Sequence, residues 1–298
     1  MHKATLAMLA LTFLAGCAAP PQADVVTTSY PVHFLAERLA GDALAVALVG
    51  RPGVDLHAFE PTVRDVQAIR GARLLVHHGL GVEPWVGRTL ASLGEDAPPS
   101  VEAGTAPPGE DLLHGDGHGE HAGEEAGIDP HTWLDPLAYR AEAGRVADAL
   151  ATHFPEHAAA IAGRAAALHE ELGRLDADFR NGLRECQRHA VATNHDAHGY
   201  LARRYDFILH SLHGLEPGSQ PDPGAVDDVI QAIRREGIPV LFLEEGTDPG
   251  AVRAIQEETG VGVETLYTLE QPPEGGQGGY LELQRENLRR LRAALGCA

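Results

Sequence analysis

The chain has 298 residues, with 23 basic and 43 acidic side chains, a formal net charge of −20 and a hydrophobic fraction of 44%. This length is enough for two domains with cores of their own. The acidic balance repels nucleic acid and anionic lipid and attracts cations, so we expect a cationic partner and no nucleic acid.

The first residues predict an export signal. Lys3 precedes an apolar run at 6–15, which is too short and too early to be a spanning helix. The run ends in Leu-Ala-Gly-Cys, where Cys17 matches the lipidated cysteine of bacterial lipoproteins; the alternative is an ordinary cleaved signal. We expect a signal peptide at 1–16, a lipid anchor on Cys17 and a tether at 17–23.

The next segment has the pattern of parallel βα units, because short apolar runs alternate with stretches of helical period. The predicted strands lie at 24–29, 43–50 and 73–79, and the predicted helices at 31–41, 62–72 and 84–93. Residues 97–127 interrupt this pattern. They contain Pro, Gly, acidic residues and His with almost no large apolar side chain, which predicts a surface loop.

Helical period returns at residue 136, and 155–183 is the longest helical stretch, rich in alanine. A second alternating block follows, with strands at 189–194, 206–212, 238–245 and 262–269 and helices at 197–205, 223–237, 249–260 and 280–295. The chain therefore divides into a first α/β lobe at 24–154, a linking helix at 155–183 and a second α/β lobe at 184–298.

Apart from Cys17, the chain has only two cysteines, Cys186 and Cys297. An exported protein can pair them, but sequence does not show whether they come close enough, so two separate buried thiols remain the alternative.

Three of the seventeen histidines stand out by their position. His57 lies between a predicted strand and a helix, His131 precedes the helix start Asp135-Pro136, and His195 follows the strand at 189–194. Open α/β sheets collect ligands at the carboxyl ends of their strands, so these loops meet if the two blocks face each other. The three histidines are far apart in the sequence and form no local metal-binding motif. The residues alone therefore do not decide whether the three share one metal site.

Five segments together resemble the solute-binding proteins of zinc and manganese ABC transporters, the ZnuA-like group. They are TTSYPVHFLAERLAGD, GVDLHAFEPTVRDVQAI, IDPHTWLDPLAY, ATNHDAHGYLARRY and IPVLFLEEGTDPGAVRAIQEETG. The resemblance covers about residues 24–295. It implies an α/β fold of two (β/α) lobes with parallel sheets joined by one long helix, a metal site in the interlobe cleft, and delivery of the metal to a membrane permease by what we expect to be a monomer.

The resemblance also implies a ligand set. His57, His131 and His195 match the family's first three metal ligands, and the third is usually a glutamate in manganese-type members. Imidazole suits Zn²⁺ better, whereas oxygen ligands suit manganese. Three imidazoles in tetrahedral geometry leave one position for a carboxylate or water.

The fourth ligand is where the chain departs from the family. The late aspartate of the manganese-type pattern aligns with Leu269, and zinc-type members that shift the acid by one residue match Glu270. Glu244 and Glu245 are competing candidates, and water is a further alternative. We predict Glu270.

Residues around these ligands have two interpretations. The His/acid-rich loop at 109–127, with His114, His118 and His121, is either a solvated acidic loop or a flexible zinc collector close to His131. Trp133 can shield the site from water. Asp135 and Asp196 are candidate partners for the second nitrogens of the ligating imidazoles.

The leading hypothesis is a lipid-anchored carrier, in the periplasm or at the cell surface, that binds Zn²⁺ and delivers it to an ABC permease without a catalytic step. The alternatives are a manganese carrier, an adhesin and a zinc hydrolase. A hydrolase would need a general base beside a metal-bound water, and the sequence shows no motif that supplies one.

Overall fold

The computed structural model describes residues 23–50, 54, 56–115, 127–215, 223–273 and 278–298. The predicted signal peptide, Cys17, His118 and His121 lie outside the described residues. Within these ranges no helix has both the length and the apolar character needed to cross a membrane.

The first lobe is a parallel four-stranded sheet of order β2-β1-β3-β4. Its strands are β1 (Val25–Thr27), β2 (Val46–Leu48), β3 (Leu74–His77) and β4 (Ser100–Glu102), and its helices are α1 (Tyr30–Ala40), α2 (Val63–Gly71) and α3 (Pro84–Leu93). Successive strand residues point to opposite faces. Val25 accordingly joins the core under α1, whereas Val26 joins the core under α2 and α3.

Strand β4 corrects the prediction of a continuous loop at 97–127. Ser100 and Glu102 are exposed and Val101 is half-buried, so the strand carries no apolar run that sequence reasoning can detect. It forms because β3 offers a free edge, and Leu75 to His77 pair with it in parallel register.

The second lobe repeats the topology, with order β6-β5-β7-β8. It contains β5 (Ala190–Thr193), β6 (Ile208–Ser211), β7 (Val240–Leu243), β8 (Gly262–Thr265), α6 (Gly199–Tyr205), α7 (Pro223–Glu236), α8 (Arg253–Thr259) and α9 (Tyr280–Leu295). Strand β8 is shorter than the predicted strand at 262–269. The chain leaves the sheet after Thr265, because the backbone N–H groups of Tyr267 and Thr268 bond to side chains of Asn287 and Glu245.

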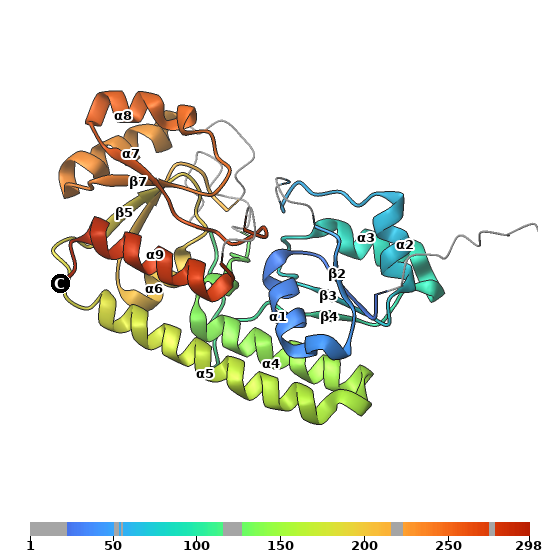
Figure 1. Ribbon diagram of the computed structural model, residues 1–298. Coiled ribbons are helices and arrows are strands. Elements are labelled where there is room, and N and C mark those ends of the chain that lie inside the picture. Colours follow the sequence, from blue (N-terminus) through green and yellow to red (C-terminus); the bar gives the residue numbers. More distant parts are fainter. Residues whose placement is uncertain (1–22, 51–53, 55, 116–126, 216–222, 274–277) are drawn as a thin grey trace, which may run out of the picture.

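Two long helices, α4 (Pro136–His153) and α5 (Ala158–Gly182), lie side by side along one side of both lobes (Figure 1). As predicted, Asp135 caps α4 and Pro136 opens it: the Asp135 carboxylate accepts the N–H groups of Leu137 and Ala138. Helix α5 buries one apolar stripe, which consists of Ile161, Leu168, Leu172, Leu175 and Phe179.

The largest core is continuous between the lobes. It takes side chains from α1 of the first lobe, from α4 and α5, and from α6 and α9 of the second. At its centre Tyr139 of α4 stacks on Tyr280 of α9 with ring centroids 4.2 Å apart. Cys186 and Cys297 form a disulfide that ties the end of the chain to the segment after α5.

Candidate metal centre

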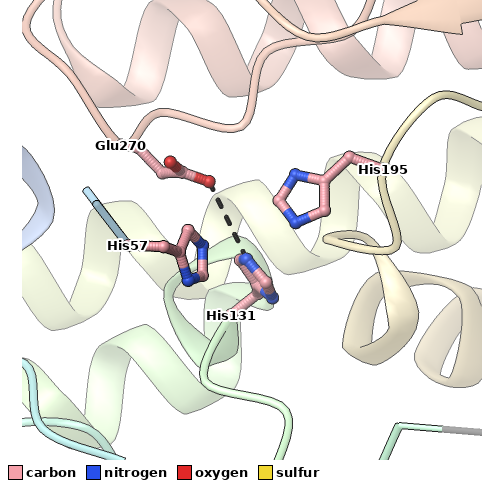
Figure 2. Close-up of side chains that lie close together, drawn as sticks. All are labelled: His57, His131, His195 and Glu270. Carbon is pink, nitrogen blue, oxygen red and sulfur yellow. Dashed lines mark ion pairs between the residues drawn. The ribbon is translucent and has the colours of Figure 1, made fainter. Parts of the chain in front are cut away.

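The structure brings the four predicted ligands together. One donor atom from each of His57, His131, His195 and Glu270 lies within 4.8 Å of the other three (Figure 2). The first two side chains come from the first lobe and the other two from the second, so the cluster lies between the lobes. The ring centroids of His131 and His195 are 4.9 Å apart, and that of His57 is 5.5 Å from His131.

His131 is fully buried and held in one orientation. Asp129 accepts its backbone N–H at 2.9 Å and contacts its Nδ1 at 2.8 Å through the same oxygen. This leaves Nε2 facing the cluster, 3.7 Å from Oε1 of Glu270. The prediction that Asp135 bonds to a ligating imidazole is wrong. Its carboxylate accepts hydrogen bonds from the α4 amides and from Arg204, the latter at 2.6 Å.

A buried polar network supports the loop that carries His131. The Nε2 of His78 contacts the carbonyl of Pro130 at 2.7 Å, and the Thr132 hydroxyl donates to Glu142 of α4 at 2.5 Å. Pro130 and Thr132, the two neighbours of His131 in the chain, are thus each held by a buried side chain. Trp133 is also fully buried, with its ring 5.1 Å from that of His131, and so closes this side of the site to solvent.

His195 is held by Glu244, whose carboxylate lies 3.0 Å from Nδ1 and also accepts the Asn194 amide at 3.1 Å. The Nε2 of His195 lies 3.0 Å from the Leu215 carbonyl. The predicted partner Asp196 does not take the Nδ1 position. His195 lies two residues after β5, and Glu244 directly follows β7, the neighbour of β5 in the sheet. Both therefore lie at the point where the strand order reverses.

The electrostatics of the two buried imidazoles differ. Burial, together with the nearby imidazoles of His195 and His57, holds the pKa of His131 well below its usual value, so this ring is neutral. Burial alone would also lower the pKa of His195, but its hydrogen bond to Glu244 and the charges of Glu270 and Glu244 raise that pKa to about 9. Burial raises the pKa of Asp129 to about 7.

The three competing acids occupy different places. Glu270 is 7% exposed and faces the imidazoles, Glu244 lies behind His195, and Glu245 accepts the backbone N–H groups of Thr268 and Leu269. Of the three, Glu270 alone belongs to the cluster of four donor groups found among the described residues.

His57 comes from the loop between β2 and α2. Its neighbours Leu56 and Phe59 are each 5% exposed, and Phe59 packs edge-on against Trp85 with ring centroids 5.4 Å apart. These anchors hold the loop on the first lobe and leave the half-buried His57 ring at the cleft.

Sequence reasoning missed several supporting roles, namely those of Asp129, Glu244 and Glu245 and that of the pair of His78 and Glu142. Only Asp129 carried a usable signal, since an acid two residues before a ligand is within reach of its ring. The others lie far along the chain from the groups that they contact.

Two α/β lobes with imidazoles and a carboxylate converging between them define a metal-binding solute-binding protein. The sequence profile of the family described as zinc-uptake complex component A, periplasmic (ZnuA), matches residues 25–294. The chain belongs to this family, as the five sequence segments predicted.

Known relatives agree with this assignment. The chain is 28% identical to the zinc-binding lipoprotein AdcA of Streptococcus pneumoniae over 96% of its own length, and it spans 59% of that relative. A solved mutant structure of the laminin-binding adhesin Lmb from Streptococcus agalactiae superposes with a TM-score of 0.82 at 29% identity, covering 92% of this chain and 99% of Lmb. Zn(II)-bound AdcA gives a TM-score of 0.77 at 26% identity, covering 92% and 58% of the two chains.

Proposed function

We propose that His57, His131, His195 and Glu270 bind one Zn²⁺, which the protein carries to an ABC permease. The observation that carries this proposal is the convergence of four donor atoms within 4.8 Å. Tetrahedral zinc with ligand distances of about 2.1 Å needs its donors about 3.4 Å apart, so small side-chain movements complete the site.

The donor set favours zinc over manganese. Three imidazole nitrogens and one carboxylate oxygen suit Zn²⁺, whereas Mn²⁺ prefers a larger share of oxygen ligands. The relatives named above as zinc-binding support the same metal.

A carrier also fits the site better than a hydrolase does. Catalytic zinc usually has three protein ligands and an open position for a reactive water. Here Glu270 takes that fourth position.

The test is a calorimetric titration of the metal-free protein with Zn²⁺ and with Mn²⁺. We expect one tight zinc site and far weaker manganese binding. The single variants His57→Ala, His131→Ala and His195→Ala should each lose the tight site. His210→Ala is the matched control, because the half-buried His210 contacts Glu236 in the second lobe and does not belong to the cluster. Tight zinc binding in the single cluster variants would contradict the proposal.

We further propose that Cys17 is lipidated after removal of residues 1–16 and that it tethers the carrier outside the cytoplasm. The lipoprotein name of the relative AdcA supports this location. Cell fractionation checks it: the Cys17→Ser variant should leave the membrane fraction and keep its zinc affinity. A variant that stays in the membrane fraction would overturn the lipid anchor.

A further inference from the structure

A carboxylate outside the proposed ligand set is hydrogen-bonded to the backbone of the loop at 267–271, which carries Glu270. Glu245, two residues after β7, accepts the N–H of Thr268 at 2.8 Å through one oxygen and the N–H of Leu269 at 2.9 Å through the other. Thr268 and Leu269 are the two residues that immediately precede Glu270. Both oxygens of the Glu245 carboxylate are thus bonded to the backbone of this loop.

The loop has a backbone conformation that needs such support. Leu269 has a φ of +59°, in the left-handed region that residues with a Cβ seldom adopt. Its side chain is fully buried, which fixes the direction in which the chain continues. The turn at Leu269 directs the next side chain, Glu270, towards the imidazoles (Figure 2).

The first lobe holds the same loop from the other side. The indole N–H of Trp133 donates to the Thr268 carbonyl at 2.8 Å, and the N–H of Tyr30 donates to the Glu270 carbonyl at 3.3 Å. Trp133 lies two residues after His131. Glu245 and Trp133 together therefore set where the Glu270 carboxylate stands relative to the His131 ring.

We propose that Glu245 is a positioning residue for zinc capture, which acts by holding the Glu270 carboxylate ready for the metal. This inference rests on the proposed function of the cluster. Because Glu245 acts through the loop, its removal should weaken binding only as far as Glu270 contributes to binding.

The first test is the variant Glu245→Gln, which keeps the size of the side chain but replaces one acceptor oxygen with an NH₂ group facing a backbone N–H. Loss of a supporting partner of a metal ligand typically weakens metal binding 10- to 100-fold, and we expect a zinc dissociation constant raised by about that factor. Asp248→Asn is the matched control: the Asp248 carboxylate also accepts a backbone N–H, that of Gly250, but at an exposed turn.

The second test asks whether Glu245 acts through Glu270. In the Glu270→Gln background, adding Glu245→Gln should cause little further loss of zinc affinity. In protein loaded with Co²⁺, the visible absorption spectrum of Glu245→Gln should move towards that of Glu270→Gln. An undiminished loss in the double variant, or an unchanged affinity in the single variant, would overturn the proposal.

Circular dichroism shows whether Glu245→Gln folds. If it does not, a third variant provides an independent test. Trp133→Phe removes the indole donor to Thr268 and should show the same coupling to Glu270; additive losses would contradict the inference. Wild-type titration separates this outcome from failure of the proposed function. A wild type without a tight zinc site refutes the function, whereas a tight wild-type site with no coupling refutes only the role of Glu245.

Discussion

The two most deeply buried imidazoles of the cluster each have a carboxyl group in contact with Nδ1. Asp129 contacts Nδ1 of His131, and Glu244 contacts Nδ1 of His195. Such partners fix the ring orientation and increase the basicity of the other nitrogen, Nε2. In His195 this nitrogen contacts the Leu215 carbonyl, a contact that a bound metal would replace. The orientation of both rings is therefore set by residues outside the proposed ligand set.

The first prediction concerns Glu244. Glu244→Gln should weaken zinc binding about 10- to 100-fold, because His195 loses its charged partner. Competition with a chromophoric chelator measures the change. Glu236→Gln serves as the control, since Glu236 makes the equivalent contact with His210 away from the site. Equal affinities for Glu244→Gln and wild type would contradict this role.

The second prediction concerns Glu142, which is fully buried beneath Thr132. Burial raises its pKa from 4.5 to about 8, so the folded state binds this proton more tightly than the unfolded state does. The contribution of Glu142 to the unfolding free energy is therefore fully present below pH 4.5 and is lost as pH rises towards 8. Each unit of pKa difference corresponds to about 1.4 kcal/mol.

Urea unfolding of the metal-free protein at pH 5 and pH 8 checks this sign. Wild type should lose more stability across that range than Glu142→Gln, whose amide does not titrate. Both proteins share every other titrating group, so the difference between them isolates Glu142. Parallel pH profiles would show that the carboxyl is ionised in the folded state.

At the scale of elements, the ligand loops depend on contacts between segments that are distant in sequence. The turn after His131, Thr132–Leu134, is bonded to α9: Gln284 donates to the Leu134 carbonyl at 3.1 Å, and the Tyr280 hydroxyl donates to the Trp133 carbonyl. Helix α9 of the second lobe therefore anchors the loop of the first lobe that carries His131.

The third prediction concerns the disulfide that fixes the segment following α9. Cys297→Ser should lower the unfolding free energy by about 2–4 kcal/mol, because the unfolded chain gains freedom when the bridge between Cys186 and Cys297 is lost. Zinc affinity should stay within about twofold, since neither cysteine belongs to the ligand cluster. Urea unfolding and zinc titration measure the two effects, and unchanged stability would contradict the first.

At the scale of the whole molecule, the continuous core limits how the lobes can move. Helices α4 and α5 pack along both lobes, and side chains of α1 and α9 join the same core. Opening the lobes as rigid bodies would expose part of this apolar surface, at a free-energy cost of about 25 cal/mol per Å². Movement confined to the ligand loops avoids that cost.

The fourth prediction follows from this shared core. Zinc binding should leave the radius of gyration unchanged in small-angle X-ray scattering. Hydrogen exchange should slow at 129–134, 193–198 and 267–271, which carry three of the four proposed ligands. A clear compaction on zinc addition would indicate hinge closure and contradict the prediction.

The amino-acid sequence by itself determined the alternation of strands and helices, the long helix and the three candidate imidazoles. Strand and helix periodicity is a local property, and His57, His131 and His195 sit beside element boundaries that it reveals. The family resemblance narrowed the fourth position to a few acids. The resemblance did not reveal why Glu270 faces the imidazoles whereas Glu244 and Glu245 have supporting roles.

Only the tertiary structure decided that difference, because similar carboxylates acquire different roles from contacts far away in sequence. Glu244 meets His195, whereas Glu245 meets the loop whose turn at Leu269 directs Glu270 to the cluster. The pairing of the cysteines and the edge strand β4 depended likewise on neighbours supplied by the fold. Long-range contacts of this kind leave no periodic pattern in a sequence.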